Sequence, residues 1–375
     1  MKKNLQLALA LTLGLATTVS AQDWSVDSKT RTTNVESNGV TGMSTEQFAR
    51  MGVSFGGDAV SVHASFNAYM PLGMDASSFG LHEAYASSNL LDYATVSAGR
   101  MALNFGSGRI IGSNDWANNG NTWDGFMFGI NNDFADVTVG MANGNYGEDF
   151  PATEDLAAYS YEANQKDMFV NISKSMGDIS FNATYVNNEF TVTETGFEDY
   201  SEESTTMGLE MAYPMANGID LSLGYYTNEV DGEDAGQLTS LGASYGVNDN
   251  MSVFAGYDMY DAGGFYVASG NVISGAGTGM TAITQEGTDM ILGGTYTMGD
   301  FSFSATMHKF ESDLVDVEET AETEGVDYIQ TMDVMDFNVS YTLSDNSSLG
   351  LTYSTNTTDD HDNGNVMWLG LNVGF

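Results

Sequence analysis

The sequence predicts an all-β fold, a transmembrane antiparallel β-barrel of 18 strands, with 16 as the alternative if a weak early strand is misplaced. Three observations predict it. Apolar and polar residues alternate with period two over much of the chain. Short turns alternate with longer polar connections along the chain. The composition has 43 Gly against 3 Pro, a balance that favours long strands joined by tight turns.

Residues 1–21 have the features of a secretory signal peptide. Lys2 and Lys3 supply the charged start, residues 5–16 are apolar, and Val19-Ser20-Ala21 is a small-residue cleavage site. We therefore expect residues 22–375 to form the mature barrel. No later stretch reaches about 18 apolar residues, so an exported chain of this kind is secreted, periplasmic or inserted as a barrel in an outer membrane.

The strands are read from the alternation. Between residues 60 and 70, apolar side chains occupy the even positions and polar or aromatic ones mostly the odd positions. The same alternation returns at 179–185, 207–213, 219–225, 251–257, 337–343 and 349–353. Eight hairpins supply sixteen strands, and a first strand near 23–34 and a last one near 366–375 bring the count to 18.

The connections fall into two classes. Eight short turn signals are rich in Gly, Asn and Asp, and they lie at 57–58, 90–92, 131–133, 176–178, 216–218, 247–249, 298–300 and 344–346. The segments predicted as long loops are 144–165, 189–203, 228–237, 261–286, 311–327 and 355–364. Short turns on the periplasmic side and long loops outside are typical of outer-membrane barrels.

Charge and residue types exclude several functions. The chain has 51 Asp and Glu against 10 Lys and Arg, a net charge of −41 that excludes a nucleic-acid partner bound by a basic surface. It has no Cys, no phosphate-binding motif, and four His outside any recognisable catalytic constellation. We therefore expect neither an enzyme nor a cofactor. The segment 359–364 fails as an EF-hand because His361 and Gly370 stand at ligand positions, so a metal site stays undetermined.

The chain ends in a strand with Met367, Leu369, Leu371, Val373 and Phe375 on one face. This segment resembles the C-terminal strand by which the barrel-assembly machinery recognises outer-membrane barrels, whose last residue is typically aromatic. The resemblance implies that Phe375 is the assembly signal. The alternative, an edge strand of a secreted β-sandwich, fits a long series of two-faced strands poorly.

Residues 81–126 carry a more specific resemblance. They contain Leu81-His82-Glu83-Ala84-Tyr85, Gly99-Arg100, Phe105-Gly106, Arg109, Gly112, Asp115-Trp116 and Asp124-Gly125-Phe126. This stretch resembles the alginate-export type of outer-membrane porin, in which the loop lies near or within the pore. The resemblance implies that Arg100, Arg109, Asp115 and Trp116 line the pore.

The basic residues depart from that family. Exporters of a polyanion have a lumen rich in Arg and Lys, whereas removal of Lys2 and Lys3 leaves eight basic residues here. They are scattered along the chain at Lys29, Arg31, Arg50, Arg100, Arg109, Lys166, Lys174 and Lys309. We therefore expect no basic ladder and no alginate export.

Acidic residues are expected on the inner face instead. If the apolar rows face lipid, the opposite rows place five carboxylates in the lumen: Glu210, Asp220, Asp258, Asp289 and Asp336. Acidic groups lining a low-dielectric wall favour cations, although in a wide pore they would be ordinary solvated residues with mild selectivity. Acids also crowd the predicted loops, where they could attract cations or bind divalent cations that crosslink loops or lipopolysaccharide.

The expected function is that of an outer-membrane porin through which ions, chiefly cations, and small polar solutes diffuse passively. We expect the loop 104–121 to form the constriction, with Arg109 opposite acidic wall residues in a transverse field. The alternative is a loop-plugged structural or adhesive surface barrel that binds divalent cations. Expected partners are outer-membrane lipid, lipopolysaccharide and the assembly machinery. The apolar outer rows would serve lipid and a partner barrel alike, so a monomer and a homotrimer are both open.

Overall fold

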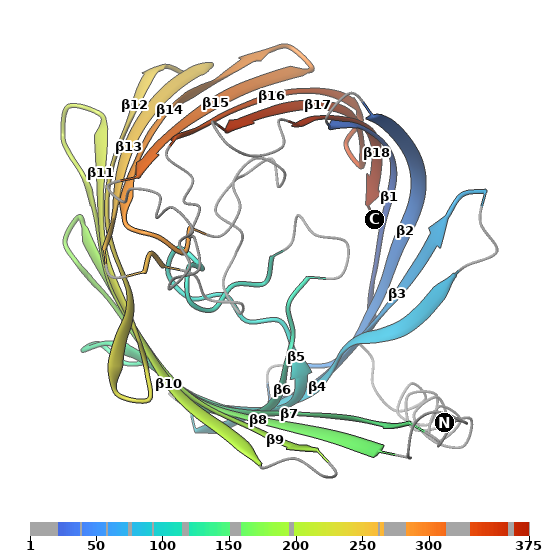
Figure 1. Ribbon diagram of the computed structural model, residues 1–375, viewed down its shortest axis with the longest axis vertical. Helices are drawn as coiled ribbons and strands as arrows, with labels where there is room; N and C mark the ends of the chain where they lie inside the picture. The colour runs from blue at the N-terminus through green and yellow to red at the C-terminus, as the bar shows by residue number, and fades with distance from the viewer. Residues whose placement is uncertain are drawn as a thin grey trace, which may run out of the picture.

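The computed structural model describes residues 22–37, 40–57, 59–73, 77–91, 94–114, 120–150, 159–194, 199–261, 263–265, 283–312, 331–358 and 364–374. These residues form one closed, antiparallel sheet of 18 strands, in which each strand pairs with its neighbours in sequence (Figure 1). β1 pairs with β2 on one side and with β18 on the other, and this last pairing closes the barrel. The predicted fold class and the count of 18 are confirmed.

The strands vary in length from 8 to 18 residues. Their bounds are β1 Gln22–Ser37, β2 Val40–Gly56, β3 Val60–Pro71, β4 Ser78–Leu91, β5 Ala94–Met101, β6 Trp123–Ile130, β7 Asp136–Phe150, β8 Tyr159–Met176, β9 Ile179–Glu194, β10 Tyr200–Pro214, β11 Ile219–Val230, β12 Glu233–Asn248, β13 Met251–Asp261, β14 Gly287–Met298, β15 Phe301–Ser312, β16 Thr331–Ser344, β17 Ser347–Thr358 and β18 Gly364–Gly374. No helix among the described residues is long and apolar enough to cross a bilayer.

All eight predicted short turns join consecutive strands, but several predicted loops are shorter than expected. β7 continues to Phe150 and pairs with β8 up to Tyr159, inside the segment predicted as a loop. β11 and β12 are joined by Asp231 and Gly232 alone, with φ of 51° and 80°, as a tight hairpin turn requires. Polar residues on both faces remove the alternation there, while the cross-strand hydrogen bonds continue.

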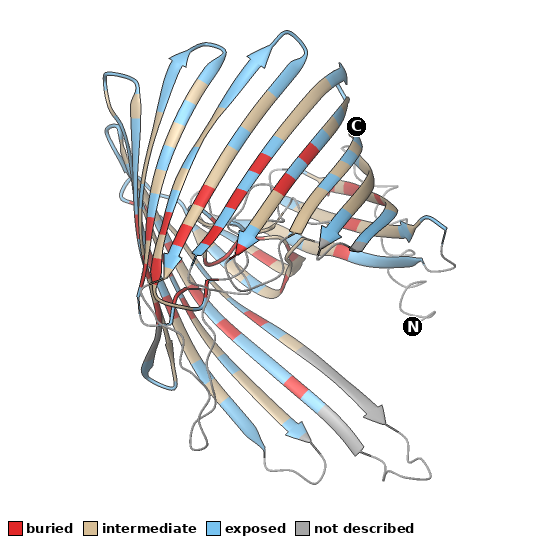
Figure 2. Cartoon of the chain, turned by 45° about the horizontal axis from the view of Figure 1, so that its top comes forward, coloured by how far each residue is buried: buried red, intermediate tan, exposed pale blue. Residues whose placement is uncertain are grey.

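The outer face of the barrel is apolar. Leu209, Leu223 and Tyr225 are 61%, 43% and 43% exposed, whereas Thr206 and Tyr226, on the opposite face, are buried. Figure 2 shows the resulting change between exposed and less exposed positions along the strands. Exposed aromatic rings stand near the short turns: Tyr213, Tyr245, Tyr296 and Phe301. An apolar band edged by aromatic residues suits a strand wall in lipid, where closure also satisfies the backbone hydrogen bonds.

The interior of the barrel contains an apolar core. The connection between β5 and β6 runs into the barrel (Figure 1), and its side chains Leu103, Ile110 and Ile111 are 7%, 3% and 0% exposed. They belong to one cluster with side chains of the wall, which include Tyr226, Leu238, Tyr260, Phe310, Met332 and Val334. The inward loop is therefore packed against β11 to β16, as a protein core is, and does not hang freely in water.

Candidate functional site

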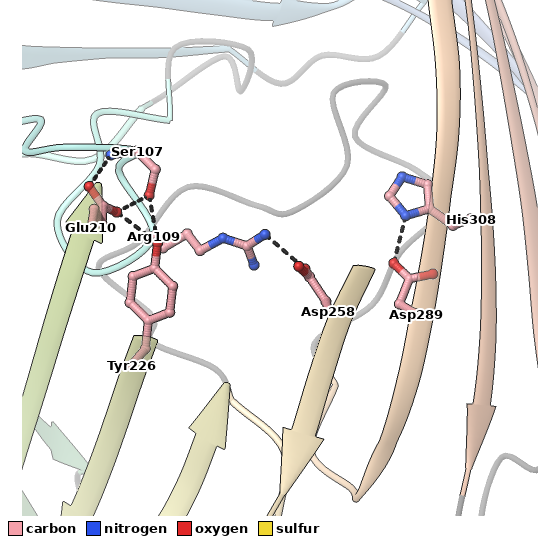
Figure 3. A network of polar contacts seen from close by, with 7 residues as sticks. All are labelled: Ser107, Arg109, Glu210, Tyr226, Asp258, Asp289 and His308. Carbon is pink, nitrogen blue, oxygen red and sulfur yellow. Dashed lines mark hydrogen bonds and ion pairs between the residues drawn. The ribbon is translucent and has the colours of Figure 1, made fainter. Parts of the chain in front are cut away.

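The described part of the β5–β6 connection, residues 102–114 and 120–122, forms the first part of the site. We call this connection the inward loop. Its anchor at Ser107 contacts two wall strands. The Ser107 backbone N–H donates to Glu210 Oε2 over 2.9 Å, the Ser107 hydroxyl donates to Glu210 Oε1, and Tyr226 donates its hydroxyl to Glu210 Oε1 over 2.8 Å (Figure 3). The Glu210 carboxylate on β10 therefore binds both the inward loop and the neighbouring strand β11.

Gly106 permits this close approach. Its φ is +57°, and a Cβ at this position would lie 1.9 Å from Glu210 Oε2 and 2.8 Å from Asn182 Oδ1. A left-handed backbone and a missing side chain are both needed, and glycine supplies both. The Gly106-Ser107 pair is thus the point at which the loop is docked on the wall.

Arg109 forms the second anchor. Its Nη2 donates to Asp258 Oδ2 on β13 over 2.8 Å, and its guanidinium lies 5.8 Å from the centre of the Tyr226 ring (Figure 3). The Asp258 side chain is 1% exposed and that of Arg109 is 20% exposed. Burial lowers the pKa of Arg109, but the charge and hydrogen bond of Asp258 outweigh it and raise the pKa above its ordinary value, so the guanidinium stays charged.

Three carboxylates lie buried on the wall next to this anchor. Asp258 and Asp289 face each other across β13 and β14, where like charges repel. Arg109 contacts the first, and His308 Nδ1 contacts Asp289 Oδ2 over 2.8 Å, so each of these two carboxylates has its own hydrogen-bond partner. Asp336 on β16 is 2% exposed and faces Ser354 across the strand pair. We call Asp258, Asp289 and Asp336 the acidic row.

The acidic row is incompletely satisfied. The Oδ1 atoms of Asp258, Asp289 and Asp336 are buried and have no hydrogen-bond partner among the described residues. Buried polar atoms without partners are rare in folded proteins, and where they line a lumen, water or a passing ion can satisfy them. Within the described part of the chain, no group of three or more His, Asp or Glu side chains is arranged to hold a metal ion.

The other sequence-predicted residues lie apart from this network. Asp220 is exposed on the inward row of β11, near the short-turn end. Arg100 forms a two-armed ion pair with Asp124 at 2.6 and 2.5 Å, on the row that carries exposed Phe126. That row belongs to the outer face, so Arg100 is not brought to Arg109. Asp115, Trp116, Phe375, the signal segment 1–21 and residues 359–363 lie outside the described residues.

Three basic residues that are scattered in the sequence come together on β1 and β2. Arg31 faces Glu46 and Asp27 faces Arg50 in the β1–β2 register, which sets Lys29 between them. The expectation that the basic residues stay dispersed is therefore wrong for these three. Each has an acidic or polar partner: Lys29 with Asp27 at 3.6 Å, Arg31 with Glu46 at 3.9 Å, and Arg50 with Asn67 at 2.8 Å.

Ser107 and Tyr226 belong to the candidate site, and sequence reasoning missed them. The Gly106-Ser107-Gly108 run is a turn signal, and Tyr226 has the same inward parity as Ser222. Parity along β11 could have placed the ring inside the barrel, whereas its contact with a loop 119 residues away could not be read from spacing.

Comparison with known proteins identifies the class. The model of the family described as Gram-negative porin matches residues 6–361 of the chain. The chain therefore belongs to the Gram-negative porin family: it is a porin-like channel protein of the outer membrane, in contact with outer-membrane lipid. The narrower resemblance to alginate-export porins stays a prediction.

Solved structures of three Pseudomonas aeruginosa proteins share the fold. OccK3 (OpdO) is 14% identical with a TM-score of 0.66, and the alignment covers 97% of this chain and 98% of that one. OpdL is 10% identical with a TM-score of 0.65, covering 95% and 99%, and OccK8 (OprE) is 12% identical with a TM-score of 0.64, covering 95% and 98%. At these identities the likeness concerns the fold alone. No curated protein matches the chain.

Proposed function

We propose that this porin is a water-filled, cation-preferring channel for passive diffusion of ions and small polar solutes. One observation carries the proposal: three carboxylates of the acidic row lie 0 to 2% exposed on the inner wall beside the inward loop. Arg109 and His308 are the groups that contact them. A low-dielectric wall of this kind concentrates the field of its carboxylates and raises the local concentration of cations.

The basic residues of β1 and β2 are also compatible with a preference for cations. Lys29 and Arg31 lie within 4 Å of Asp27 and Glu46, so their positive charges are largely offset where they stand. Within the described part of the chain, Asp336 forms no ion pair with Lys or Arg. We therefore expect the carboxylates to dominate the electrostatic potential in the lumen, and a transverse field between β13–β16 and β1–β2 to orient dipolar solutes.

The competing function is a barrel closed by its loops, with a structural or adhesive role and divalent cations bound at its acidic rim. The apolar cluster inside the barrel favours it, because Ile111, Phe265 and Ile283 fill part of the interior with side chains that exclude water. Asp115 and Trp116 stay candidate lining residues on the strength of the family resemblance.

Single-channel recording separates the two functions. The full mature chain, refolded in detergent and shown to be folded by its heat-dependent electrophoretic mobility, is inserted in a planar bilayer in KCl. The channel proposal predicts stable open steps, and swelling of liposomes that contain the protein when small polar solutes are added. A folded barrel that neither conducts nor admits solutes would overturn the proposal in favour of the closed barrel.

A further inference from the structure

The wall opposite the acidic row contains a cavity of different chemistry. It has a volume of about 690 Å³, within the range of about 300–1,000 Å³ typical of ligand sites. Its lining includes the returning limb of the inward loop at 120–122 and the long-loop halves of β7 to β11. We call it the amide cavity. It is separate from the Ser107 and Arg109 anchors, whose residues do not line it.

Strand register arranges the polar side chains of the amide cavity in two neighbouring levels. At the upper level, Asp167 faces Asn188 across β8 and β9, and Asn188 faces Ser204 across β9 and β10. At the lower level, Thr206 faces Asn228 across β10 and β11, and donates its hydroxyl to Asn228 Oδ1 over 2.9 Å. Amides and hydroxyls from four strands therefore point into one space.

The cavity also has an apolar side. Trp123 and Val186 line it, and Trp123 meets Phe169 edge to face with ring centres 5.6 Å apart. Trp123 and Val186 are 8% and 5% exposed, so their positions are fixed by packing. The cavity therefore offers two kinds of contact. Trp123 and Val186 can pack against C–H groups of a ligand, and the amides and hydroxyls can form hydrogen bonds with its O–H groups.

The amide cavity has few charged side chains, although the chain is strongly acidic. Asp167 accepts from Gln165 at 3.2 and 3.0 Å and from Asn188 at 2.5 Å, so both its oxygens are occupied by neutral donors. Asp124, at the rim, is held by the two arms of Arg100. Among the described residues, no Lys or Arg lines the cavity. An anionic solute would meet no basic side chain among the described lining residues, and a cationic solute would meet the carboxylate of Asp167 already engaged by two amides.

From this lining we infer that the amide cavity binds a neutral polyhydroxylated solute, that is, a short saccharide. Each amide that donates to Asp167 still carries a carbonyl oxygen that can accept from a sugar hydroxyl, and each hydroxyl can donate or accept. The ring face of the sugar packs on Trp123 and Val186. The inference rests on the proposed channel function, because the saccharide reaches the cavity along the diffusion path.

The test uses maltotriose as the probe and a poly(ethylene glycol) of similar mass as the size control, because that polymer lacks the row of hydroxyl groups. We expect maltotriose to interrupt the KCl current of single channels for longer than the polymer does. Asn188→Ala shortens the interruptions about three- to tenfold, as expected for loss of one or two hydrogen bonds. The matched control Asn338→Ala, on β16, removes an amide that accepts from Thr352 at 2.6 Å on another part of the wall, and leaves the interruptions unchanged.

Two results would overturn the inference: interruptions by maltotriose no longer than those by the polymer, or equal residence in Asn188→Ala and the native chain. If Asn188→Ala does not fold, Thr206→Val replaces it, since the two side chains have nearly the same shape. Isothermal titration of maltotriose into the detergent-folded barrel separates the two proposals. Conductance without binding rejects the saccharide site alone, and binding without conductance rejects the channel alone.

Discussion

Arg109 Nη2 donates to Asp258 Oδ2 over 2.8 Å, although 149 positions separate the two residues in the chain. The pair joins the inward loop to β13 inside the barrel. Removing one partner of a buried ion pair leaves the other charge without compensation, at a cost of about 3–5 kcal/mol, whereas the intact pair is close to neutral relative to apolar residues. The position of the loop therefore depends on both partners being present.

Replacement of Arg109 by Met tests this anchor. The variant keeps much of the side-chain volume but leaves Asp258 buried and unpaired, so we expect a lower unfolding temperature and a noisier, larger conductance. Single-channel recording and heat-dependent mobility measure both effects. Lys166→Met is the control, because Lys166 and Glu189 are about half exposed and such pairs contribute about 1 kcal/mol or less. Equal behaviour of the two variants would contradict the anchor.

Substitution of Gly106 by Ala tests the docking point at Glu210. The new methyl group would lie 1.9 Å from Glu210 Oε2, so either the Glu210 carboxylate or the loop must move, and we expect the conductance to change as the Ser107 anchor is lost. Gly177→Ala is the matched control, because Gly177 has a similar φ of +62° in a short turn with nothing within 4 Å of the added Cβ. Both variants share the backbone strain, and only Gly106→Ala adds the clash. A native conductance in Gly106→Ala would show that the loop is not held there.

Asp336 tests the cation preference. Asp336→Asn removes a negative charge from the acidic row while keeping the side-chain shape, so the reversal potential in a KCl gradient should move toward zero. The shift should fade as salt rises, because the screening length falls from about 30 Å at 0.01 M to about 3 Å at 1 M. Asp345→Asn, in an exposed short turn, is the control. A larger shift in Asp345→Asn than in Asp336→Asn would assign the cation preference to the short-turn end of the barrel and not to the acidic row.

The two faces of β11 test which side meets lipid. Leu223 is 43% exposed on the outer row, and its neighbour Ser222 belongs to the inner row. Leu223→Arg should destabilise the folded barrel by up to about 2–4 kcal/mol, depending on depth, whereas Ser222→Arg should fold normally. The folded fraction in lipid vesicles, followed by heat-dependent mobility, measures this. Normal folding of Leu223→Arg together with failure of Ser222→Arg would reverse the faces.

Much of the fold could be predicted from the sequence because lipid imposes a strict alternation on the strands that cross it. The apolar row from Met207 to Tyr213 and the turn at 216–218 were enough to place β10, β11 and their faces. The predicted strand ends were wrong where the strands extend beyond the lipid and the alternation is no longer required. β11 and β12 continue to Val230 and from Glu233 with polar residues on both faces, so the pattern at 228–237 resembled a loop.

The site was predicted less completely, for a different reason. Parity alone placed Asp258, Asp289 and Asp336 on the inner wall, where the structure has them. Contacts between distant segments carry no periodic signal, so the sequence placed Arg109 opposite acidic wall residues without naming Asp258 as its partner. Strand register also determines which residues become neighbours, and spacing along the sequence does not reveal it. The register brings Arg31 and Arg50 together on β1 and β2, and it sets Arg100 beside Asp124 on the outer row.

The central claim is that ions cross this barrel past the acidic row. The most direct test is the reversal potential of single native channels in a planar bilayer, measured under a KCl gradient at low total salt. The account predicts open channels whose reversal potential lies toward the equilibrium potential of K⁺. Open channels that reverse toward the equilibrium potential of Cl⁻ would contradict it.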